Sequence, residues 1–442
     1  MLELFSAGLV SGWLQMAGLP ASIDPWESLS QSNLPTAFWH PPSDPSAEKI
    51  IAQYLKLLKS QGLEESNQGV WLQSGTTLLG DHRSIVPMPA ASLTKVATSL
   101  AALQTWDINH QFETTIATTG TIQNGVLQGD LIIQDGGDPL FVWEDAVAVG
   151  NALNKLGIGR VAGDLIIAGK WMMNFETEPE RSSDLLKKAW NPKADDEDTR
   201  AEWAALPDKT RRPTIAIAGK VRSALLNLPN QTVLMRHRSL PLIHLIKYLN
   251  VHSQNEMSQS LADQMGGTQA VMQKAAAASG IAPSELQLVN GSGLGMENRI
   301  SAHAVCAMFA AIDRQVHPLN LTIGDLFPVA GVDGGTLEDR STPNWSVVKT
   351  GTLNEVSALA GVVPTRDRGL VWFAVINRGS NISELRKQQD LLLQTLQKTW
   401  GTIDAAPMIE PSAWIGPQRD RLDAQTRNQE AAVSAEIGVN RT

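Results

Sequence analysis

The sequence predicts an α+β fold that carries an inserted α/β module. Compact helix and strand patterns occupy residues 46–110 and return at 236–402, whereas the texture of the chain changes between them, over 111–235. Within this middle part, Gly-Asp-Leu-Ile-Ile at 129–133 recurs at 163–167, with a helix-like stretch between the two copies. Two copies are too few for a solenoid, so we expect a strand–helix–strand piece of a separate module.

Local patterns predict the elements one by one. Ser46 is the expected N-cap of an amphipathic helix, and residues 69–79 are typical of one or two strands. Residues 93–103 carry mostly small or apolar side chains, which predicts a buried helix. The remaining expected elements are helices at 143–156, 241–265 and 382–400, and strands at 345–349, 357–363 and 370–377.

Three polar segments are expected to lack regular structure. Residues 1–45 are predicted to form an N-terminal segment and an irregular lead-in, and residues 403–442 a polar C-terminal tail. The strongly charged stretch 176–212 is predicted to be a solvated loop. Residues 4–16 are apolar, which suits either the core of a signal peptide without its usual positive start or a helix packed on the protein. No other run approaches the length of a membrane span, so we expect the rest of the chain to be soluble.

Composition excludes some classes of function. The chain has 442 residues, 43% of them hydrophobic, which is enough for a sizeable core. Its net charge is −9, and a protein of this charge is a poor candidate for sequence-independent nucleic-acid binding. Cys306 is the single cysteine, so no intramolecular disulfide can form.

The pattern S-x-x-K occurs at Ser92-Leu93-Thr94-Lys95, where the serine opens the expected buried helix. Residues i and i+3 are neighbours on a helix, so Lys95 lies within reach of the Ser92 hydroxyl. A lone ammonium in apolar surroundings has a lowered pKa, which makes the neutral amine available as a base for a serine nucleophile. The same pattern at Ser46–Lys49 lies on an amphipathic helix, and at Ser346–Lys349 on a strand, where i and i+3 face opposite sides.

Two further patterns follow along the chain. Ser253-Gln254-Asn255 fits S-x-N in a turn between helices, although Tyr248-Leu249-Asn250 fits the related Y-x-N. Lys349-Thr350-Gly351-Thr352 fits K-T-G and follows a strand-like run, as an edge strand beside a cleft would. Gly351 would let the backbone of a ligand approach closely. The three patterns, in this order, are the set found in penicillin-binding proteins and class A β-lactamases.

With these motifs, the sequence resembles the D-alanyl-D-alanine carboxypeptidase/endopeptidase family of low-molecular-mass, class C penicillin-binding proteins. The resemblance spans about residues 48–400 and includes segments beyond the three motifs. These are Asp135-Gly136-Gly137-Asp138-Pro139, Asn290-Gly291-Ser292-Gly293-Leu294 with Asn298-Arg299-Ile300-Ser301, and Pro328-Val329-Ala330-Gly331-Val332-Asp333-Gly334. It implies the penicillin-binding/β-lactamase-like transpeptidase fold, an antiparallel sheet flanked by helices, with the module inserted between the first two motifs.

The sequence also departs from the family pattern. Asn290 stands where the family usually has Asp, Gly295-Met296-Glu297 replaces its usual Ser-Arg-x, and residues 170–215 match poorly. No E-x-x-x-N, the arrangement with which class A β-lactamases deacylate quickly, lies between Ser253 and Lys349.

The resemblance implies a role for each site residue. Ser92 is the nucleophile, Lys95 its base, Ser253 a proton relay in contact with Lys349, and Asn255 orients Lys95 and the substrate amide. Lys349 and Thr350 hold the terminal carboxylate, and Gly351 and Thr352 belong to the same substrate-binding strand. The backbone N–H groups of Ser92 and Thr352 form the oxyanion hole.

The expected activity is therefore that of a serine DD-peptidase acting on the D-Ala-D-Ala end, or the DD-crosslinks, of peptidoglycan stem peptides. The implied partners are these peptides and, as covalent inhibitors, β-lactam antibiotics; no cofactor or metal is implied. The substrate implies a location in the periplasm or cell envelope and leaves open a peripheral membrane association. The histidines show no HExxH motif and no close ligand pairing, which speaks against a zinc site.

Three other functions remain as alternatives. A serine β-lactamase would share Ser92, Lys95 and Lys349 but turn over penicillin quickly. A catalytically idle envelope scaffold or sensor would keep the fold, and Asn290 and the remodelled insertion favour it mildly. An α/β-hydrolase is a distant third, because the sequence has no G-x-S-x-G motif.

Overall fold

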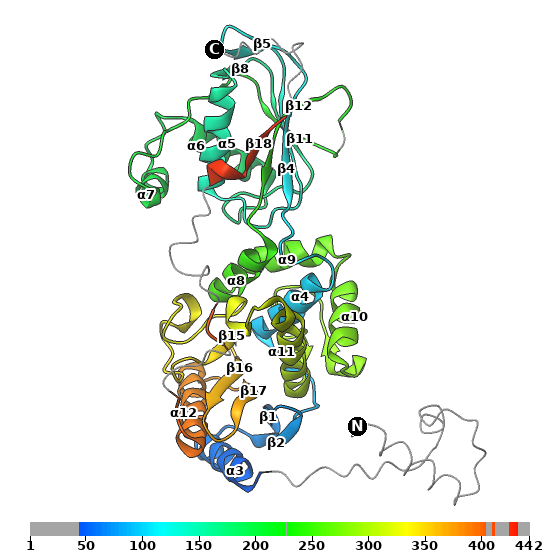
Figure 1. Cartoon of the computed structure of the whole chain (residues 1–442), viewed down its shortest axis with the longest axis vertical. Helices are drawn as coiled ribbons and strands as arrows, with labels where there is room; N and C mark the ends of the chain where they lie inside the picture. Colours follow the sequence, from blue (N-terminus) through cyan, green and yellow to red (C-terminus); the bar gives the residue numbers. More distant parts are fainter. Residues whose placement is uncertain (1–43, 227, 404–408, 412–423, 432–442) are drawn as a thin grey trace, which may run out of the picture. The chain divides into compact units, whose positions relative to one another are not determined.

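The computed structural model describes residues 44–226, 228–403, 409–411 and 424–431 (Figure 1). All of them belong to one unit of the chain, which begins at Ser43. Most of the expected lead-in, and with it the apolar stretch at 4–16, lies outside the described residues. Among the residues that are described, no helix combines the length and the apolar content needed to cross a membrane.

A five-stranded antiparallel sheet combines strands from both ends of the chain, in the order β15-β16-β17-β1-β2. Its strands are β1 (Gln68–Ser74), β2 (Thr77–His82), β15 (Val347–Leu353), β16 (Val356–Thr365) and β17 (Gly369–Arg378). The strands expected at 345–349, 357–363 and 370–377 are thereby confirmed. β15 forms one edge of the sheet, so one of its sides has no neighbouring strand in the sheet.

Helices cover both faces of this sheet. Every residue of β16 is buried, and its side chains alternate between two hydrophobic clusters. One cluster joins the sheet to α3 and α12, and the other joins it to a larger group of helices that includes α4, α8 and α11. The helices are α3 (Pro45–Ser60), α4 (Thr94–Leu103), α8 (Leu242–His252), α9 (Asn255–Gln264), α10 (Thr268–Ser279), α11 (Ala302–Val316) and α12 (Ile382–Trp400).

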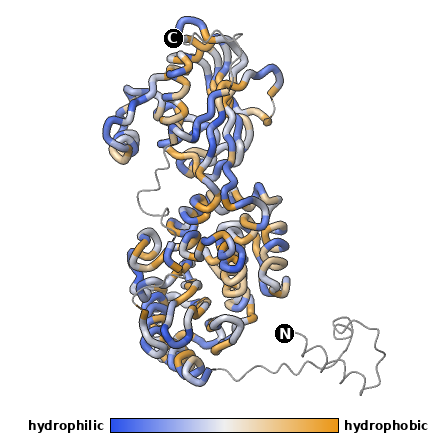
Figure 2. The backbone as a smooth tube through the Cα atoms, in the orientation of Figure 1, coloured by the Kyte–Doolittle hydropathy of each residue, from blue (hydrophilic) through white to orange (hydrophobic). Residues whose placement is uncertain are grey.

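Outer helices such as α3 and α12 bury one face and expose the other, and in Figure 2 hydrophobic residues recur along the helices beside hydrophilic ones. The expected N-cap of the first helix is wrong by two residues. Asp44, not Ser46, caps α3, and its carboxylate accepts hydrogen bonds from the backbone N–H groups of Ser46 and Ala47. Pro45 then occupies the first turn, where its missing N–H costs nothing.

A small sheet supports the start of α4. It has the order β13-β14-β3, with β3 (Met88–Pro89), β13 (Leu286–Gln287) and β14 (Arg299–Ile300). β3 leads directly into the 3₁₀ turn η2 (Ala91–Leu93) and then α4. The sheet therefore ties residues 88–93 to the chain around 286–300.

The residues between the two parts of this body form a module with its own hydrophobic core. Its six-stranded sheet has the order β11-β9-β7-β4-β12-β18, and a four-stranded sheet has the order β10-β8-β6-β5. The strands are β4 (Glu113–Thr118), β5 (Ile122–Gln123), β6 (Val126–Leu127), β7 (Leu131–Gln134), β8 (Arg160–Val161), β9 (Leu165–Ala168), β10 (Ala216–Ile217), β11 (Val221–Ala224), β12 (Thr232–Arg238) and β18 (Asn428–Glu430).

The repeated Gly-Asp-Leu-Ile-Ile segments lie side by side in this sheet. β7 and β9 pair in parallel, with Leu131 opposite Leu165 and Ile132 opposite Ile166. The helix between the copies is α5 (Trp143–Lys155), which makes the connection that two parallel strands require. The predicted strand–helix–strand piece is confirmed.

The charged stretch 176–212 is not wholly a loop, contrary to expectation. It contains α6 (Pro179–Trp190) and α7 (Glu197–Ala205). α6 buries Leu186 and Trp190 against the module while its charged residues face outward. The acidic run supplies an N-cap, because the Asp196 carboxylate accepts a hydrogen bond from the backbone N–H of Thr199.

Part of the expected polar tail is also structured. Ala424–Arg427 form a 3₁₀ turn (η7) and Asn428–Glu430 form β18, which pairs antiparallel with β12 of the module. We call residues 424–430 the C-terminal strap. The prediction of a tail over 403–442 is therefore wrong for these residues.

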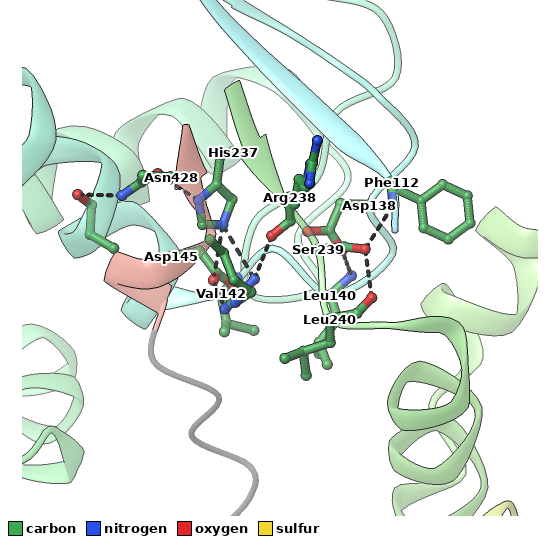
Figure 3. Close-up of polar contacts among 12 residues, drawn as sticks. Phe112, Asp138, Leu140, Val142, Asp145, His237, Arg238, Ser239, Leu240 and Asn428 are labelled. Carbon is green, nitrogen blue, oxygen red and sulfur yellow. Dashed lines mark hydrogen bonds and ion pairs between the residues drawn. The ribbon is translucent and has the colours of Figure 1, made fainter. Parts of the chain in front are cut away.

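A buried polar cluster fastens the strap (Figure 3). Arg427 forms an ion pair with Asp145 of α5, and His237 Nε2 lies 3.2 Å from Asp145 Oδ1. His237 Nδ1 lies 2.8 Å from Asn428 Oδ1 on the strap. Burial alone would raise the pKa of Asp145, but Arg427 and His237 hold it below its ordinary value.

Candidate active site

Ser92 and Lys95 meet at the start of α4. Ser92 lies in the 3₁₀ turn η2, and Lys95 Nζ is 3.0 Å from Ser92 Oγ, as the i, i+3 spacing predicts. All residues of α4 are buried, including Lys95. Ala91, just before the nucleophile, has a φ of 49°, a left-handed conformation that is strained for a residue with a Cβ. The turn therefore holds the Ser92 hydroxyl in a fixed, locally strained position.

Three acceptors surround the Lys95 amine. Besides Ser92 Oγ, they are Asn255 Oδ1 at 2.7 Å and the backbone oxygen of Ser292 at 2.8 Å. Burial lowers the pKa of Lys95 to about 7, and the carboxylate of Glu256 opposes this shift. The neutral amine, the form that can accept a proton, is therefore well populated near neutral pH.

The S-x-N motif forms the turn between α8 and α9. Ser253 ends α8 with a φ of 55°, and Asn255 is the first residue of α9. This confirms the predicted turn, and the single helix expected at 241–265 is wrong because the chain reverses at Ser253. The turn belongs to the S-x-N pattern and not to the Y-x-N pattern. Asn250 of the Y-x-N pattern lies inside α8, where its Nδ2 donates to Ser99 Oγ and to the backbone oxygen of Leu326.

Lys349 connects the third motif to the second. It lies on the edge strand β15, and its Nζ donates to Ser253 Oγ at 2.9 Å and to the backbone oxygen of Thr350 at 2.9 Å. The side chain is fully buried, which lowers its pKa, and the nearby Lys95 lowers it further. A bound anion would favour the charged form of Lys349, so the site is suited to a carboxylate.

The K-T-G strand runs close to the nucleophile. A Cβ on Gly351 would lie 3.1 Å from the backbone nitrogen of Ser92 and 2.9 Å from the backbone oxygen of Ala90. Gly351 thus permits the close approach of β15 to the Ser92 turn. Thr350 is buried, whereas the Thr352 hydroxyl accepts a hydrogen bond from Arg386 Nη2 of α12 at 2.9 Å.

The loop Asn290–Gly293 contributes a contact that the sequence analysis did not assign. The backbone oxygen of Ser292 accepts from Lys95, and the oxygen of Gly291 accepts from Thr98 Oγ1 at 2.8 Å. Asn290 Oδ1 accepts from the backbone nitrogens of Ser292 and Gly293, at 3.2 and 2.7 Å. An amide oxygen serves here where the family has a carboxylate, and the Asn290 side-chain nitrogen donates to Leu294 O at 2.7 Å. The departure at Asn290 therefore leaves the loop intact.

The five predicted polar residues thus form two hydrogen-bonded groups. In one group Lys95 contacts Ser92 and Asn255, and in the other Lys349 contacts Ser253. This sequence matches the model of the D-Ala-D-Ala carboxypeptidase 3 (S13) family over residues 51–195 and 195–399. The chain belongs to this family. Its membership confirms the predicted family and a serine-type D-Ala-D-Ala carboxypeptidase.

Known proteins resemble the chain over most of its length. The carboxypeptidase DacB of Mycolicibacterium smegmatis is 25% identical over 349 residues, which are 68% of this chain and 74% of that protein. Penicillin binding protein 4 of Haemophilus influenzae has a TM-score of 0.58 and 22% identity, over 78% of this chain and 98% of its own. A predatory peptidoglycan endopeptidase of Bdellovibrio bacteriovorus has a TM-score of 0.64 and 19% identity, over 76% and 94%. The two structures confirm the predicted fold.

Proposed function

We propose that Ser92 carries out the family's reaction on the D-Ala-D-Ala end of peptidoglycan stem peptides, through an acyl-enzyme. The observation that carries this proposal is the connected group of Ser92, Lys95 and Asn255, with the Ser253–Lys349 pair completing the motif set. A nucleophile, a base with a pKa near 7 and a buried lysine whose charged form a bound carboxylate would stabilise are the parts that acyl transfer from a carboxylate-bearing peptide needs.

In the acylation step, Ser92 Oγ attacks the carbonyl carbon of the penultimate D-Ala and its proton passes to Lys95 Nζ. The negative charge that develops on the carbonyl oxygen is stabilised by the backbone N–H groups of Ser92 and Thr352. A donor of this kind contributes about 3–4 kcal/mol. The closeness of Gly351 to residues 90–92 supports this assignment, because it keeps the two N–H groups on neighbouring segments.

In the departure step, the peptide C–N bond breaks and Ser253 delivers a proton to the amine of the leaving D-Ala. Lys349 and Thr350 hold the terminal carboxylate of that residue, and Asn255 orients Lys95 and the substrate amide. The contact of Ser253 Oγ with Lys349 Nζ supports the place of Ser253 beside the leaving residue. The proton that Ser253 delivers is the one that Lys95 took from Ser92, which leaves Lys95 neutral again. Water then attacks the ester on Ser92 and releases the shortened peptide.

Cleavage of DD-crosslinks would be the same reaction with a larger leaving group. A cavity of about 970 Å³ borders His252, the residue before Ser253, and is lined by α8 and by module residues such as Phe175. None of the predicted site residues lines this cavity, so the proposal of crosslink cleavage rests on the chemistry alone. The polymer lies in the cell envelope, so we place the protein in the periplasm or envelope.

β-Lactams should acylate Ser92 and block the enzyme. The Bdellovibrio bacteriovorus endopeptidase has been solved acylated by penicillin G, which supports the same reaction in a chain of this fold. Lys349 would hold the β-lactam carboxylate as it holds that of the substrate.

Mass spectrometry after incubation with penicillin tests the proposal. We expect one covalent adduct on the wild type, none on Ser92→Ala, and an unchanged adduct on Ser46→Ala, which changes the serine of another S-x-x-K pattern. The wild type and Ser46→Ala should also release D-Ala from a pentapeptide, whereas Ser92→Ala should not. Rapid steady hydrolysis of nitrocefin would instead favour a β-lactamase. If the wild type folds but shows neither a penicillin adduct nor D-Ala release, the catalytically idle scaffold remains as the function.

A further inference from the structure

The segment Pro328–Gly334, which carries no assigned role, contacts the helix that ends at Ser253. Asp333 Oδ2 lies 2.6 Å from Nζ of Lys247, a residue of α8. Both side chains are largely enclosed, at 9% and 22% exposure. An ion pair this buried loses much of its attraction to desolvation, so stability alone is a weak reason for its presence.

The Lys247 ammonium has a complete set of partners. Its three hydrogens point to Asp333 Oδ2, to the backbone oxygen of Gly324 at 2.8 Å and to that of Phe327 at 2.8 Å. α8 is therefore fixed at one point to a loop that extends from Gly324 to Asp333. A second close approach lies nearer to Ser253, where a Cβ on Gly335 would be 2.5 Å from the backbone oxygen of Val251.

The same loop is fixed to the strand that carries Lys349. Asp333 Oδ2 accepts a second hydrogen bond, from the backbone nitrogen of Val329 at 2.8 Å. Val329 forms a β-bridge with Val347 of β15, and the backbone nitrogen of Val348 donates to Pro328 O at 3.0 Å. One carboxylate oxygen therefore joins α8 to the backbone that runs beside β15.

These contacts close a ring with the Ser253–Lys349 pair. From Ser253 it runs along α8 to Lys247, through Asp333 to β15, and along β15 back to Lys349, which is 2.9 Å from Ser253 Oγ. We propose that Lys247 and Asp333 are positioning residues that set the distance between Ser253 and Lys349. This inference rests on the proposed roles of Ser253 and Lys349.

The ring has a measurable consequence. If Asp333 is lost, α8 and β15 are joined near the site only by weaker contacts, and Lys349 no longer points reliably at a carboxylate. A misplacement on the order of 1 Å can cost about 100-fold in rate. The loss should fall on ligands that use their carboxylate and spare those that have none.

The experiment compares the acylation rates of penicillin G and of its methyl ester, which differ only in the carboxylate charge. We expect the wild type to prefer the acid and Asp333→Ala to lose at least about 10-fold of that preference. Asp333→Asn, which keeps an oxygen acceptor for Lys247 and Val329, should restore most of it.

Asp390→Ala is the matched control. Asp390 is also buried, pairs with Arg340 at 2.7 Å and accepts the backbone nitrogen of Ser341 at 2.9 Å, but it lies on α12. Its loss should lower stability and leave the preference unchanged. An Asp333→Ala variant whose preference stays equal to that of Asp390→Ala overturns the positioning role.

Two further results keep the test decisive. If Asp333→Ala does not fold, Lys247→Gln replaces it, because it keeps amide donors for the two carbonyls but removes the charge, and the same fall is expected. A preserved preference in that variant overturns the inference. A folded wild type that neither ligand acylates overturns the proposed function, and this inference with it.

Discussion

The backbone oxygen of Ser292 lies 2.8 Å from Lys95 Nζ and accepts one of its hydrogens. Asn255 Oδ1 accepts another at 2.7 Å. A neutral amine has two hydrogens and one lone pair, so with both hydrogens used, the lone pair turns to the remaining partner, Ser92 Oγ at 3.0 Å. The site therefore orients the lone pair of Lys95 toward Ser92 Oγ, as its proposed role as a base requires.

The first prediction concerns the pH dependence of acylation. Lys95 accepts a proton only when neutral, and its pKa is about 7, so the active form is lost as the pH falls below 7. The second-order rate of penicillin acylation should rise through pH 7 and level off above it. A rate that does not change between about pH 5.5 and 8.5 would contradict Lys95 as the base.

Glu256 provides a way to move this profile. Its carboxylate raises the pKa of Lys95, so Glu256→Gln should lower that pKa and shift the rising limb of the acylation rate to lower pH. The matched control is Glu65→Gln, an exposed carboxylate beside Lys59. Its profile should coincide with that of the wild type.

The second prediction is that Lys95→Arg abolishes acylation. The guanidinium keeps the positive charge but cannot give up its proton at neutral pH, so Ser92 loses its base. A general base contributes on the order of 100- to 10,000-fold, and we expect a loss of at least that size in the penicillin acylation rate. Lys49→Arg, in the S-x-x-K pattern on α3, should react like the wild type. Retained acylation in Lys95→Arg would show that another group removes the proton.

Some of this site could be predicted because it is local. Ser92 and Lys95 are three positions apart on one helix turn, and the mostly small or apolar side chains of 93–103 were enough to indicate that helix. The sequence alone could not decide between the S-x-N pattern at Ser253 and the Y-x-N pattern at Tyr248, because each residue lies two positions before an asparagine. Only the chain reversal at Ser253 and its contact with Lys349, distant in sequence, decide between them. The contact between Lys95 and Ser292 could not be predicted, because it uses a backbone oxygen and every residue type has one.

The errors in the fold have related causes. The stretch 176–212 was assigned as a loop from its charge alone, although Leu186 and Trp190 of α6 lie four residues apart on one helix face. The strap forms a strand of only three residues, Asn428–Glu430, below the length at which alternation can be seen. Its place depends on β12 and Asp145, which lie far away along the chain.

The third prediction concerns the close contact between the Asn290–Gly293 loop and the nucleophile turn. Gly293 has a φ of +89°, and a Cβ there would lie 1.9 Å from the backbone oxygen of Ala91. Gly293→Ala should therefore displace the turn that holds Ser92 and abolish penicillin labelling. Gly280→Ala is the control: its φ is also positive, at +71°, but nothing lies within 4 Å of the added Cβ.

The control separates the cost of the backbone conformation from the cost of the steric clash. Gly280→Ala should cost about 1–2 kcal/mol of stability from backbone conformation alone and leave labelling intact. Gly293→Ala should be less stable than Gly280→Ala by thermal unfolding. Equal stability and equal labelling in the two variants would show that the loop and the turn can move apart at no cost.

The fourth prediction concerns the C-terminal strap. Arg427→Ala removes the guanidinium that pairs with Asp145, whose side chain is only 1% exposed. His237 and the backbone N–H of Val142 still contact Asp145 in this variant. Removing one partner of a buried ion pair nevertheless costs about 3–5 kcal/mol. We therefore expect β18 to leave the sheet and the backbone amides of β12 that face it to exchange their hydrogens much faster.

Arg236→Ala is the control for this variant. Arg236 lies on the same strand, β12, and pairs with Glu113, but both side chains are well exposed, at 44% and 38%. An exposed pair contributes at most about 1 kcal/mol, so exchange in β12 should stay close to that of the wild type. Because the strap binds the module and not the Ser92 turn, Arg427→Ala should keep its penicillin adduct. An Arg427→Ala protein whose β12 amides stay protected would mean that strand pairing and Asn428, rather than the ion pair, hold the strap in place.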